Sequence, residues 1–115
     1  MALASPRRVV ASLAHALDLS GDALGHNRVL QLPGYSVSVG EMAEALRRAG
    51  GSVAHARLKW QHDLAIQAIV GSWPASLKAP RAEALGFKPD AGIDEAVQFF
   101  IADDLAAQMR LADRA

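Results

Sequence analysis

The sequence contains one unambiguous helix signal, the stretch SVGEMAEALRRAGG at residues 38–51. Ser38 and Glu41 have the spacing of a capping box, in which each side chain accepts a hydrogen bond from a backbone N–H at the helix start. Gly50 and Gly51 follow the last apolar position, where glycine commonly ends a helix. Between these signals, apolar side chains recur on one face, at Met42, Ala45, Leu46 and Ala49. We therefore expect a helix that begins after Ser38 and ends at the glycine pair.

Signals of the same kind upstream predict a helix from Pro6 to about Leu19. Ser5 is a favoured N-cap residue, and proline suits the first helical position. One side of this helix carries apolar side chains, at Val9, Val10, Leu13 and Leu17. The opposite side carries polar side chains, at Arg8, Ser12 and His15. The helix is therefore predicted to be amphipathic.

Three further helices are predicted downstream, over residues 64–72, 80–85 and 93–110. Asp63 can cap the first of them, and Pro80 can open the second. Two short strands are expected where apolar and β-prone residues cluster, at residues 28–32 and 56–60. The pattern predicts a helix-rich α+β fold of about five helices and two short strands, with residues 1–115 forming a single domain.

Composition excludes several classes of protein. The 115 residues carry 12 basic and 12 acidic side chains, so no net charge attracts nucleic acid or an anionic membrane. Cysteine is absent, which rules out disulfides and thiolate chemistry. No apolar run is long enough to span a membrane, and no signal peptide is evident, so we expect a cytoplasmic chain. Alanine supplies 24 residues, so we expect a thin core and some apolar surface that lies against something else.

Motifs for catalysis are missing. The four histidines do not have a metal-binding spacing, and the sequence has no nucleophile elbow, P-loop or dinucleotide fingerprint. We expect no metal site and no catalytic residue. Three residues stand out instead. Arg7 is either surface charge or an anion clamp at a helix start, and Trp73 is either a core plug or the wall of a ligand pocket. Phe99 is either a partly exposed ring or part of a face that binds a partner.

Four stretches, in this order, resemble the C-terminal portion of extended short-chain dehydrogenase/reductases, the NAD-dependent epimerase/dehydratase group. They are Arg28–Gly34, Ser36–Leu46, Arg81–Pro89 and Ile93–Val97. Three more resemble D-erythronate dehydrogenase-like members, which are sugar-acid oxidoreductases: Ser5–Val10, Leu32–Val37 and Ile69–Pro74. Most nucleotide-sugar members of the group carry an arginine near the position of Trp73, and its absence here favours another substrate.

The resemblance also implies what this chain lacks. The family's catalysis uses a Tyr-x-x-x-Lys pair, but here Tyr35 is followed four positions later by Val39. The family's glycine-rich cofactor turn is absent too. The resemblance therefore implies a substrate-binding lobe without its Rossmann domain, in which Arg7 and Trp73 bind a sugar or sugar acid. No cofactor is expected on this chain, and NAD(P) is implied for the full-length family enzyme.

Three interpretations remain open at this point. The chain is part of such a dehydrogenase or epimerase, which binds substrate but is not catalytic alone. Alternatively, it is a free-standing binding or oligomeric module derived from that lobe. In the third interpretation it is an unrelated helical protein. In the first two, we expect the Phe99 side of the last helix to contact a Rossmann lobe or a second copy.

Overall fold

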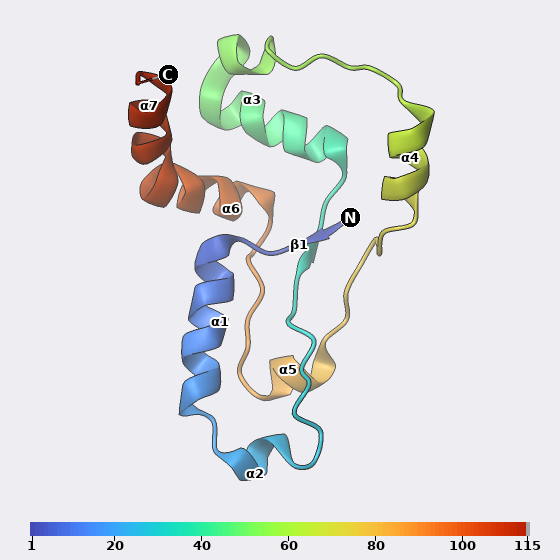
Figure 1. The fold of residues 1–115 in the computed structure, drawn as a ribbon, viewed down its shortest axis with the longest axis vertical. Helices are drawn as coiled ribbons and strands as arrows, with labels where there is room; N and C mark the ends of the chain where they lie inside the picture. Colours follow the sequence, from blue (N-terminus) through green and yellow to red (C-terminus); the bar gives the residue numbers. More distant parts are fainter. Residues whose placement is uncertain (115) are drawn as a thin grey trace.

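The structure, a computed structural model, describes residues 1–114 and has an open, elongated shape of 51 × 35 × 25 Å (Figure 1). Two short strands lie near its middle, β1 (Ala2–Leu3) and β2 (Tyr35–Ser36). The helices, in chain order, are α1 (Pro6–Asp18), α2 (Gly21–Leu24), α3 (Val39–His55), α4 (Leu64–Gly71), α5 (Pro80–Ala84), α6 (Ile93–Phe100) and α7 (Ala106–Ala112), with a π-helical segment η1 (Ile101–Leu105) between the last two. The expected helix-rich α+β class with two short strands is confirmed, although the described residues form more helices than the five expected, because α2 was not predicted and the last predicted helix is divided.

Helices α1, α3 and α4 begin where the capping signals place them. The Ser38 hydroxyl accepts from the Glu41 backbone N–H, and the Ser38 N–H donates to the Glu41 carboxylate at 2.7 Å, which completes the capping box of α3. The Ser5 hydroxyl caps α1 by accepting from the Arg8 N–H, without the reciprocal bond of a capping box. Gly51 has a φ of 73°, so α3 kinks there and continues as a short turn to His55. The glycine pair therefore ends the straight part of the helix, as expected.

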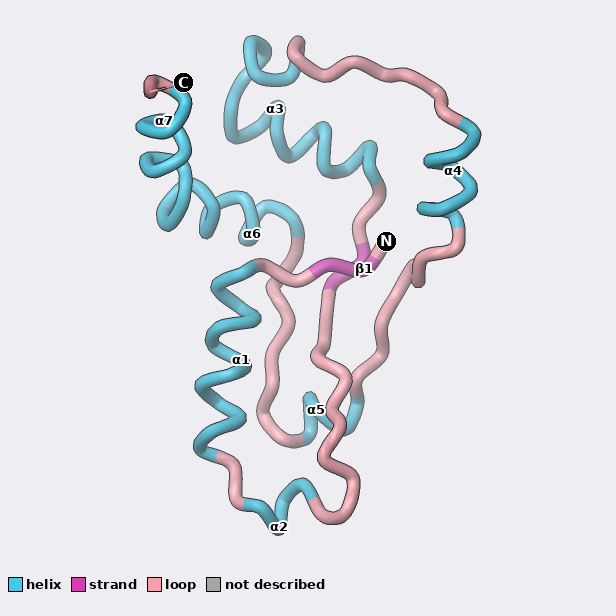
Figure 2. Tube along the Cα trace, viewed as in Figure 1, coloured by secondary structure: helices cyan, strands magenta, loops and turns pink. Residues whose placement is uncertain are grey.

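Both predicted strands are wrong in position. Residues 28–32 and 56–60 form no strand, and the chain instead pairs Ala2 with Ser36 and Leu3 with Tyr35 in an antiparallel ladder (Figure 2). An alternating sequence becomes a strand only where a neighbour satisfies its backbone groups. The loop before residue 30 is instead held by the Arg81 guanidinium, which donates to three backbone carbonyls, those of Leu24, Asn27 and Val29.

The predicted helix over 93–110 is not continuous. It is divided into α6, η1 and α7, and α7 turns away from the direction of α6 (Figure 1). The π-helical segment widens the backbone by one residue per turn, which changes the direction in which later side chains point. Residues 106–112 therefore do not continue the axis of α6, as a single straight helix over 93–110 would.

The core is small, as the alanine content suggests. Its fully buried members are Ala79, Ala82 and Phe87, and four leucines pack around them, Leu19, Leu30, Leu32 and Leu85. His15 of α1 closes one side of this core. Its ring stands edge-on to Phe87 with centroids 4.7 Å apart, and its Nε2 lies 2.7 Å from the Leu85 carbonyl oxygen. This polar residue, rather than a leucine of α1, joins that helix to the core.

The amphipathic helix α1 consequently turns its polar side toward the rest of the chain and its apolar side outward, the reverse of what its sequence pattern favours. Ser12 is buried, whereas Leu13 is exposed and Leu17 is 88% exposed. A helix normally turns its apolar stripe toward a core, so the stripe of α1 lacks a partner within residues 1–114. Separately, none of the described helices has both the length and the apolar character needed to cross a membrane.

Candidate functional site

Arg7, the predicted anion clamp, lies in the first turn of α1 and is paired with Asp103 of η1. Its Nε donates to the Asp103 carboxylate at 2.7 Å, and a second guanidinium nitrogen contacts the other carboxylate oxygen. This hydrogen bonding lowers the pKa of Asp103 and raises that of Arg7. Both side chains remain more than 40% exposed, so the pair is accessible to a competing anion.

Phe99 lies beneath this ion pair. The Arg7 guanidinium sits 4.2 Å from the centre of the ring, a cation–π contact. The ring is half-buried, whereas the next residue, Phe100, is 46% exposed. Phe99 is therefore a partly exposed ring, one of the two expectations, while the more exposed apolar side chains of the last helices are those of Phe100, Ile101, Met109 and Leu111.

Trp73, the second predicted site residue, follows α4 and does not plug the core, since it is 53% exposed. It lines a small cavity of about 190 Å³ with Met1, Ala2, Pro74 and Leu77. The Ala2 N–H donates to the Pro74 carbonyl at 3.2 Å, which ties this connection to β1. Arg7 is not among the lining residues, and α1 and the end of α4 lie on opposite sides of β1 (Figure 1). The structure therefore does not bring the two predicted site residues together.

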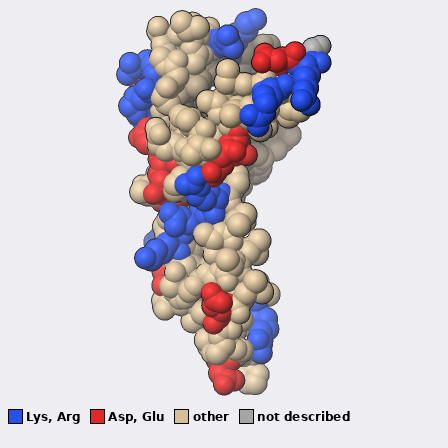
Figure 3. Space-filling model, turned by 90° about the vertical axis from the view of Figure 1, so that its left-hand side faces the viewer, with Lys and Arg blue, Asp and Glu red and all other residues tan. Residues whose placement is uncertain are grey.

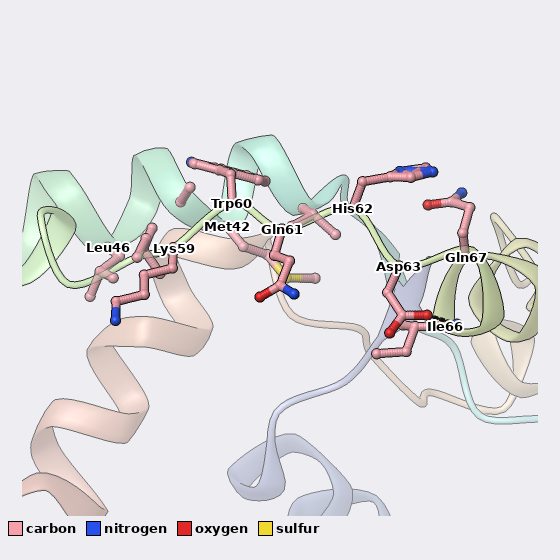
Figure 4. Close-up of a pocket in the computed structure, with 12 residues that line it drawn as sticks. Met42, Leu46, Lys59, Trp60, Gln61, His62, Asp63, Ile66 and Gln67 are labelled. Carbon is pink, nitrogen blue, oxygen red and sulfur yellow. Dashed lines mark hydrogen bonds between the residues drawn. The ribbon is translucent and has the colours of Figure 1, made fainter.

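A larger groove, which the sequence did not indicate, lies between α3 and α4 (Figure 4). Its volume is about 870 Å³, within the range of ligand-binding sites. Met42, Ala43 and Leu46 of α3 form one wall, and Ile66 of α4 lies at the other end. The connection over residues 58–63 crosses it. The alternating apolar residues of that connection, Leu58 and Trp60, were the only sequence signal for this feature.

Ion pairs join the last helices to the rest of the chain. Arg48 of α3 binds Asp94 through two nitrogens, with contacts of 2.7–3.0 Å, and Arg8 of α1 lies 3.4 Å from Glu95. The buried carboxylate of Asp90 accepts the Ser5 N–H at 2.7 Å. Figure 3 shows basic and acidic side chains interleaved on one face of the molecule. That face therefore carries no continuous basic surface.

The described residues contain no group of three or more histidine and acidic side chains arranged to hold a metal ion. Tyr35 is half-buried in β2, and its pKa is raised, first by burial and then by the charge of Asp90. A raised pKa keeps the phenol protonated, the opposite of what a lysine partner does in an activated tyrosine. The turns that lead from strands into helices, Ala4-Ser5 and Val37-Ser38, contain no glycine.

Comparison with known proteins gives relatives that are much longer than this chain. A D-erythronate dehydrogenase from Cupriavidus necator is 45% identical over 101 residues, which cover 88% of this chain and 31% of the relative. A D-erythronate dehydrogenase from Haemophilus influenzae is 38% identical over 103 residues, covering 90% and 33%. No family model matches the sequence. The chain thus spans about a third of the length of the curated relatives it matches.

A solved structure shows the same arrangement. The crystal structure of a nucleoside-diphosphate-sugar epimerase from Agrobacterium tumefaciens superposes with a TM-score of 0.85 and 34% identity, covering 91% of this chain and 31% of the epimerase. A match of this quality extends over nearly all the elements described above. The open shape, small core and outward-facing apolar stripe therefore belong to a segment that, in its relatives, is part of a longer polypeptide.

Proposed function

We propose that this chain, which is homologous to the C-terminal third of D-erythronate dehydrogenases, forms the substrate-binding part of a sugar or sugar-acid oxidoreductase. In this proposal the chain is not catalytic alone. Its function requires a dinucleotide-binding Rossmann lobe of the kind that the remaining two-thirds of the relatives would supply.

The orientation of α1 is the observation that carries this proposal. Its apolar residues Val10, Leu13 and Leu17 are exposed, while Ser12 on its polar side is buried. Burying each such apolar side chain contributes about 1.5–3 kcal/mol, so this surface favours a partner strongly. The same homologous third is covalently joined to the rest of the polypeptide in the relatives, which makes the rest of the enzyme the most direct partner.

The cofactor is proposed to bind outside this chain. NAD(P) would supply the hydride acceptor of the reaction, and its pyrophosphate usually rests on a glycine-rich turn at a helix N-terminus. Here the turn before α3 has no glycine, and its N–H groups at Ser38 and Glu41 are already used by the capping box. The residues present therefore do not fit the cofactor, and we derive no catalytic step for them.

Arg7 and Trp73 are proposed to bind substrate in the complete enzyme. Arg7 presents two donors to a carboxylate, and a substrate carboxylate would take the place of Asp103 on them. Trp73 lies apart from Arg7 in this chain, so its exposed indole beside a small cavity is proposed to contact the same substrate only in the assembled enzyme, where the two residues would have to lie closer together. No arginine occurs in the Trp73–Ser76 stretch, which favours a sugar acid over a nucleotide sugar.

A chimera tests this proposal directly. This chain would replace the matching third of the Cupriavidus necator dehydrogenase, and the reduction of NAD or NADP by D-erythronate would be measured. We expect the chimera to oxidise D-erythronate, and we expect the isolated chain to show neither activity nor a change in Tm with the cofactor. A folded but inactive chimera, or an isolated chain that the cofactor stabilises, would contradict the proposal.

The free-standing module is the alternative, and the exposed stripe of α1 is compatible with it. Light scattering of the isolated chain distinguishes the two. A stable oligomer that persists on dilution would favour the module, whereas a species that dissociates on dilution would favour a surface made for another part of an enzyme.

A further inference from the structure

In the connection between α3 and α4, residues 59–62 form a run whose backbone makes no hydrogen bonds to the described part of the chain. Within the described residues, none of the N–H or carbonyl groups of residues 59–62 forms a hydrogen bond with the chain. Figure 4 shows the side chains alternating along this run, with Trp60 and His62 on one side and Lys59 and Gln61 on the other. Alternation of this kind is the side-chain pattern of a β-strand, although no strand pairs with it here.

The surroundings of this run are apolar and uncovered. Trp60 is 69% exposed, and it lies over the groove whose wall is formed by Met42 and Leu46. Beyond the groove, α4 has the sequence LAIQAIVG and contains no buried residue. A short helix that is apolar except for one residue, here Gln67, is normally enclosed by protein. The run and α4 therefore form two sides of a space that is shaped for a further segment.

We propose that an extended segment of the dinucleotide-binding part of the enzyme adds to residues 59–62 as a β-strand and fills the groove between α3 and α4. This proposal rests on the proposed function, because the segment comes from the two-thirds of the relatives that this chain does not contain. Backbone hydrogen bonds to residues 59–62 would hold the segment, and its alternate apolar side chains would contact Met42, Leu46 and Ile66.

A strand fits this space better than a helix does, because only a strand uses the free backbone groups of the run. The rest of the same polypeptide is favoured over a second copy for a separate reason. A segment joined covalently to this chain is present at an effective concentration in the millimolar range, so the added strand needs little affinity of its own.

Hydrogen exchange tests the added strand. In the isolated chain, we expect the amides of residues 59–62 to exchange without protection. In the chimera with the Cupriavidus necator dehydrogenase, alternate amides of this run would exchange at least about a hundredfold more slowly. Ala75 and Ser76 serve as the matched control, since both are exposed and, within the described residues, their own backbone groups form no hydrogen bonds.

The outcomes separate this inference from the proposed function. An active chimera whose 59–62 amides stay unprotected would overturn the added strand and leave the proposed function standing. An inactive chimera would count against the proposed function. Protection that arises in the isolated chain at high concentration and disappears on dilution would assign the run to a second copy, and would also overturn the inference.

Proline scanning gives an independent measurement in the chimera. In a strand, neighbouring N–H groups point in opposite directions, so only one of the variants Gln61→Pro and His62→Pro removes a hydrogen bond to the added segment. We expect the two variants of the chimera to differ by about fivefold in the equilibrium constant for unfolding, which is the usual effect of one backbone hydrogen bond. Equal effects of the two variants would contradict strand pairing. Both sites are exposed and lack backbone hydrogen bonds, so both isolated chains should keep the far-ultraviolet circular dichroism of the unsubstituted chain.

Discussion

Arg7 and Asp103, which are 96 positions apart in the sequence, form a two-point ion pair that joins the first turn of α1 to the π-helical segment η1. A basic residue at a helix N-terminus opposes the helix dipole, and the Asp103 carboxylate offsets that cost. The guanidinium also covers the ring of Phe99. The pair therefore joins the last helices to a residue near the start of the chain.

Replacing this arginine tests the connection. We expect Arg7→Ala to lower the Tm of the isolated chain modestly at neutral pH and low salt, because exposed pairs contribute little and are screened by salt. The pKa of Asp103 is lowered in the folded chain, so the contribution of the pair is present above the ordinary aspartate value of 3.8 and is lost as pH falls below it. The Tm difference should therefore disappear in acid.

Arg47→Ala is the matched control, since Arg47 pairs with Glu44 inside one helix and holds no second element in place. Thermal unfolding followed by circular dichroism measures both variants. A loss of Tm in Arg7→Ala that is unchanged between neutral and strongly acid pH would show that packing on Phe99, rather than the ion pair, supplies the stabilisation.

Asp103→Asn tests the proposed role of Arg7 in substrate binding. Without the competing carboxylate, the guanidinium should bind a substrate carboxylate more readily. We expect the chimera carrying Asp103→Asn to show a lower KM for D-erythronate, and the chimera carrying Arg7→Ala to show a higher one. If KM is the same in both variants as in the unsubstituted chimera, Arg7 does not contact the substrate.

The capping box of α3 gives a prediction that depends only on local structure. Ser38→Ala removes the acceptor for the Glu41 N–H and should lower the free energy of unfolding by about 1 kcal/mol. Glu41 has a lowered pKa, chiefly because the Ser38 backbone N–H donates to its carboxylate. This second contribution is present above the ordinary glutamate pKa of 4.5 and is lost as pH falls below it.

Urea unfolding at neutral pH measures the effect of Ser38→Ala. Ser76→Ala is the control, because Ser76 is exposed and its side chain forms no hydrogen bond within the described residues. The control should leave the midpoint unchanged. An equal loss in both variants would mean that the cap does not contribute to the stability of the chain.

The helices could be predicted because their signals are local. Ser5, Ser38 and Asp63 each accept hydrogen bonds from N–H groups two or three positions later, so the residues that begin each helix lie next to one another in the sequence. The strands could not be predicted in the same way. Ala2 and Leu3 pair with residues more than thirty positions away, and nothing in a two-residue strand identifies its partner.

The candidate site was predicted only as separate residues. Arg7 and Trp73 were recognised by type and position, but the ion pair of Arg7 with Asp103 and the cavity that Trp73 shares with Met1 depend on how distant segments fold together. The orientation of α1 could not be read from its pattern either. The pattern identifies which side of a helix is apolar, while the side that faces the chain depends on which other elements are present to cover it.

The small core makes one side chain unusually important. Phe87 is the one large side chain among the buried members of this core, which it forms with Ala79 and Ala82 and against the ring of His15. We expect Phe87→Ala to lower the free energy of unfolding by about 3–4 kcal/mol, because alanine neighbours cannot fill the space that the ring leaves. Phe100→Ala, at an exposed ring, should cost much less in the isolated chain. Comparable losses in urea unfolding would mean that the core is not centred on Phe87.

The exposed stripe of α1 gives the prediction that bears most directly on function. Leu13→Glu places a charge at the centre of the stripe, where it is exposed in the isolated chain and should leave Tm nearly unchanged. In the chimera the same charge would be buried against the dinucleotide-binding part, so we expect a large loss of Tm and of NAD-dependent activity. Ala11→Glu, an exposed position of the same helix away from the stripe, should affect neither protein. If Leu13→Glu and Ala11→Glu behave alike in the chimera, the stripe is not the surface that joins this chain to the rest of the enzyme.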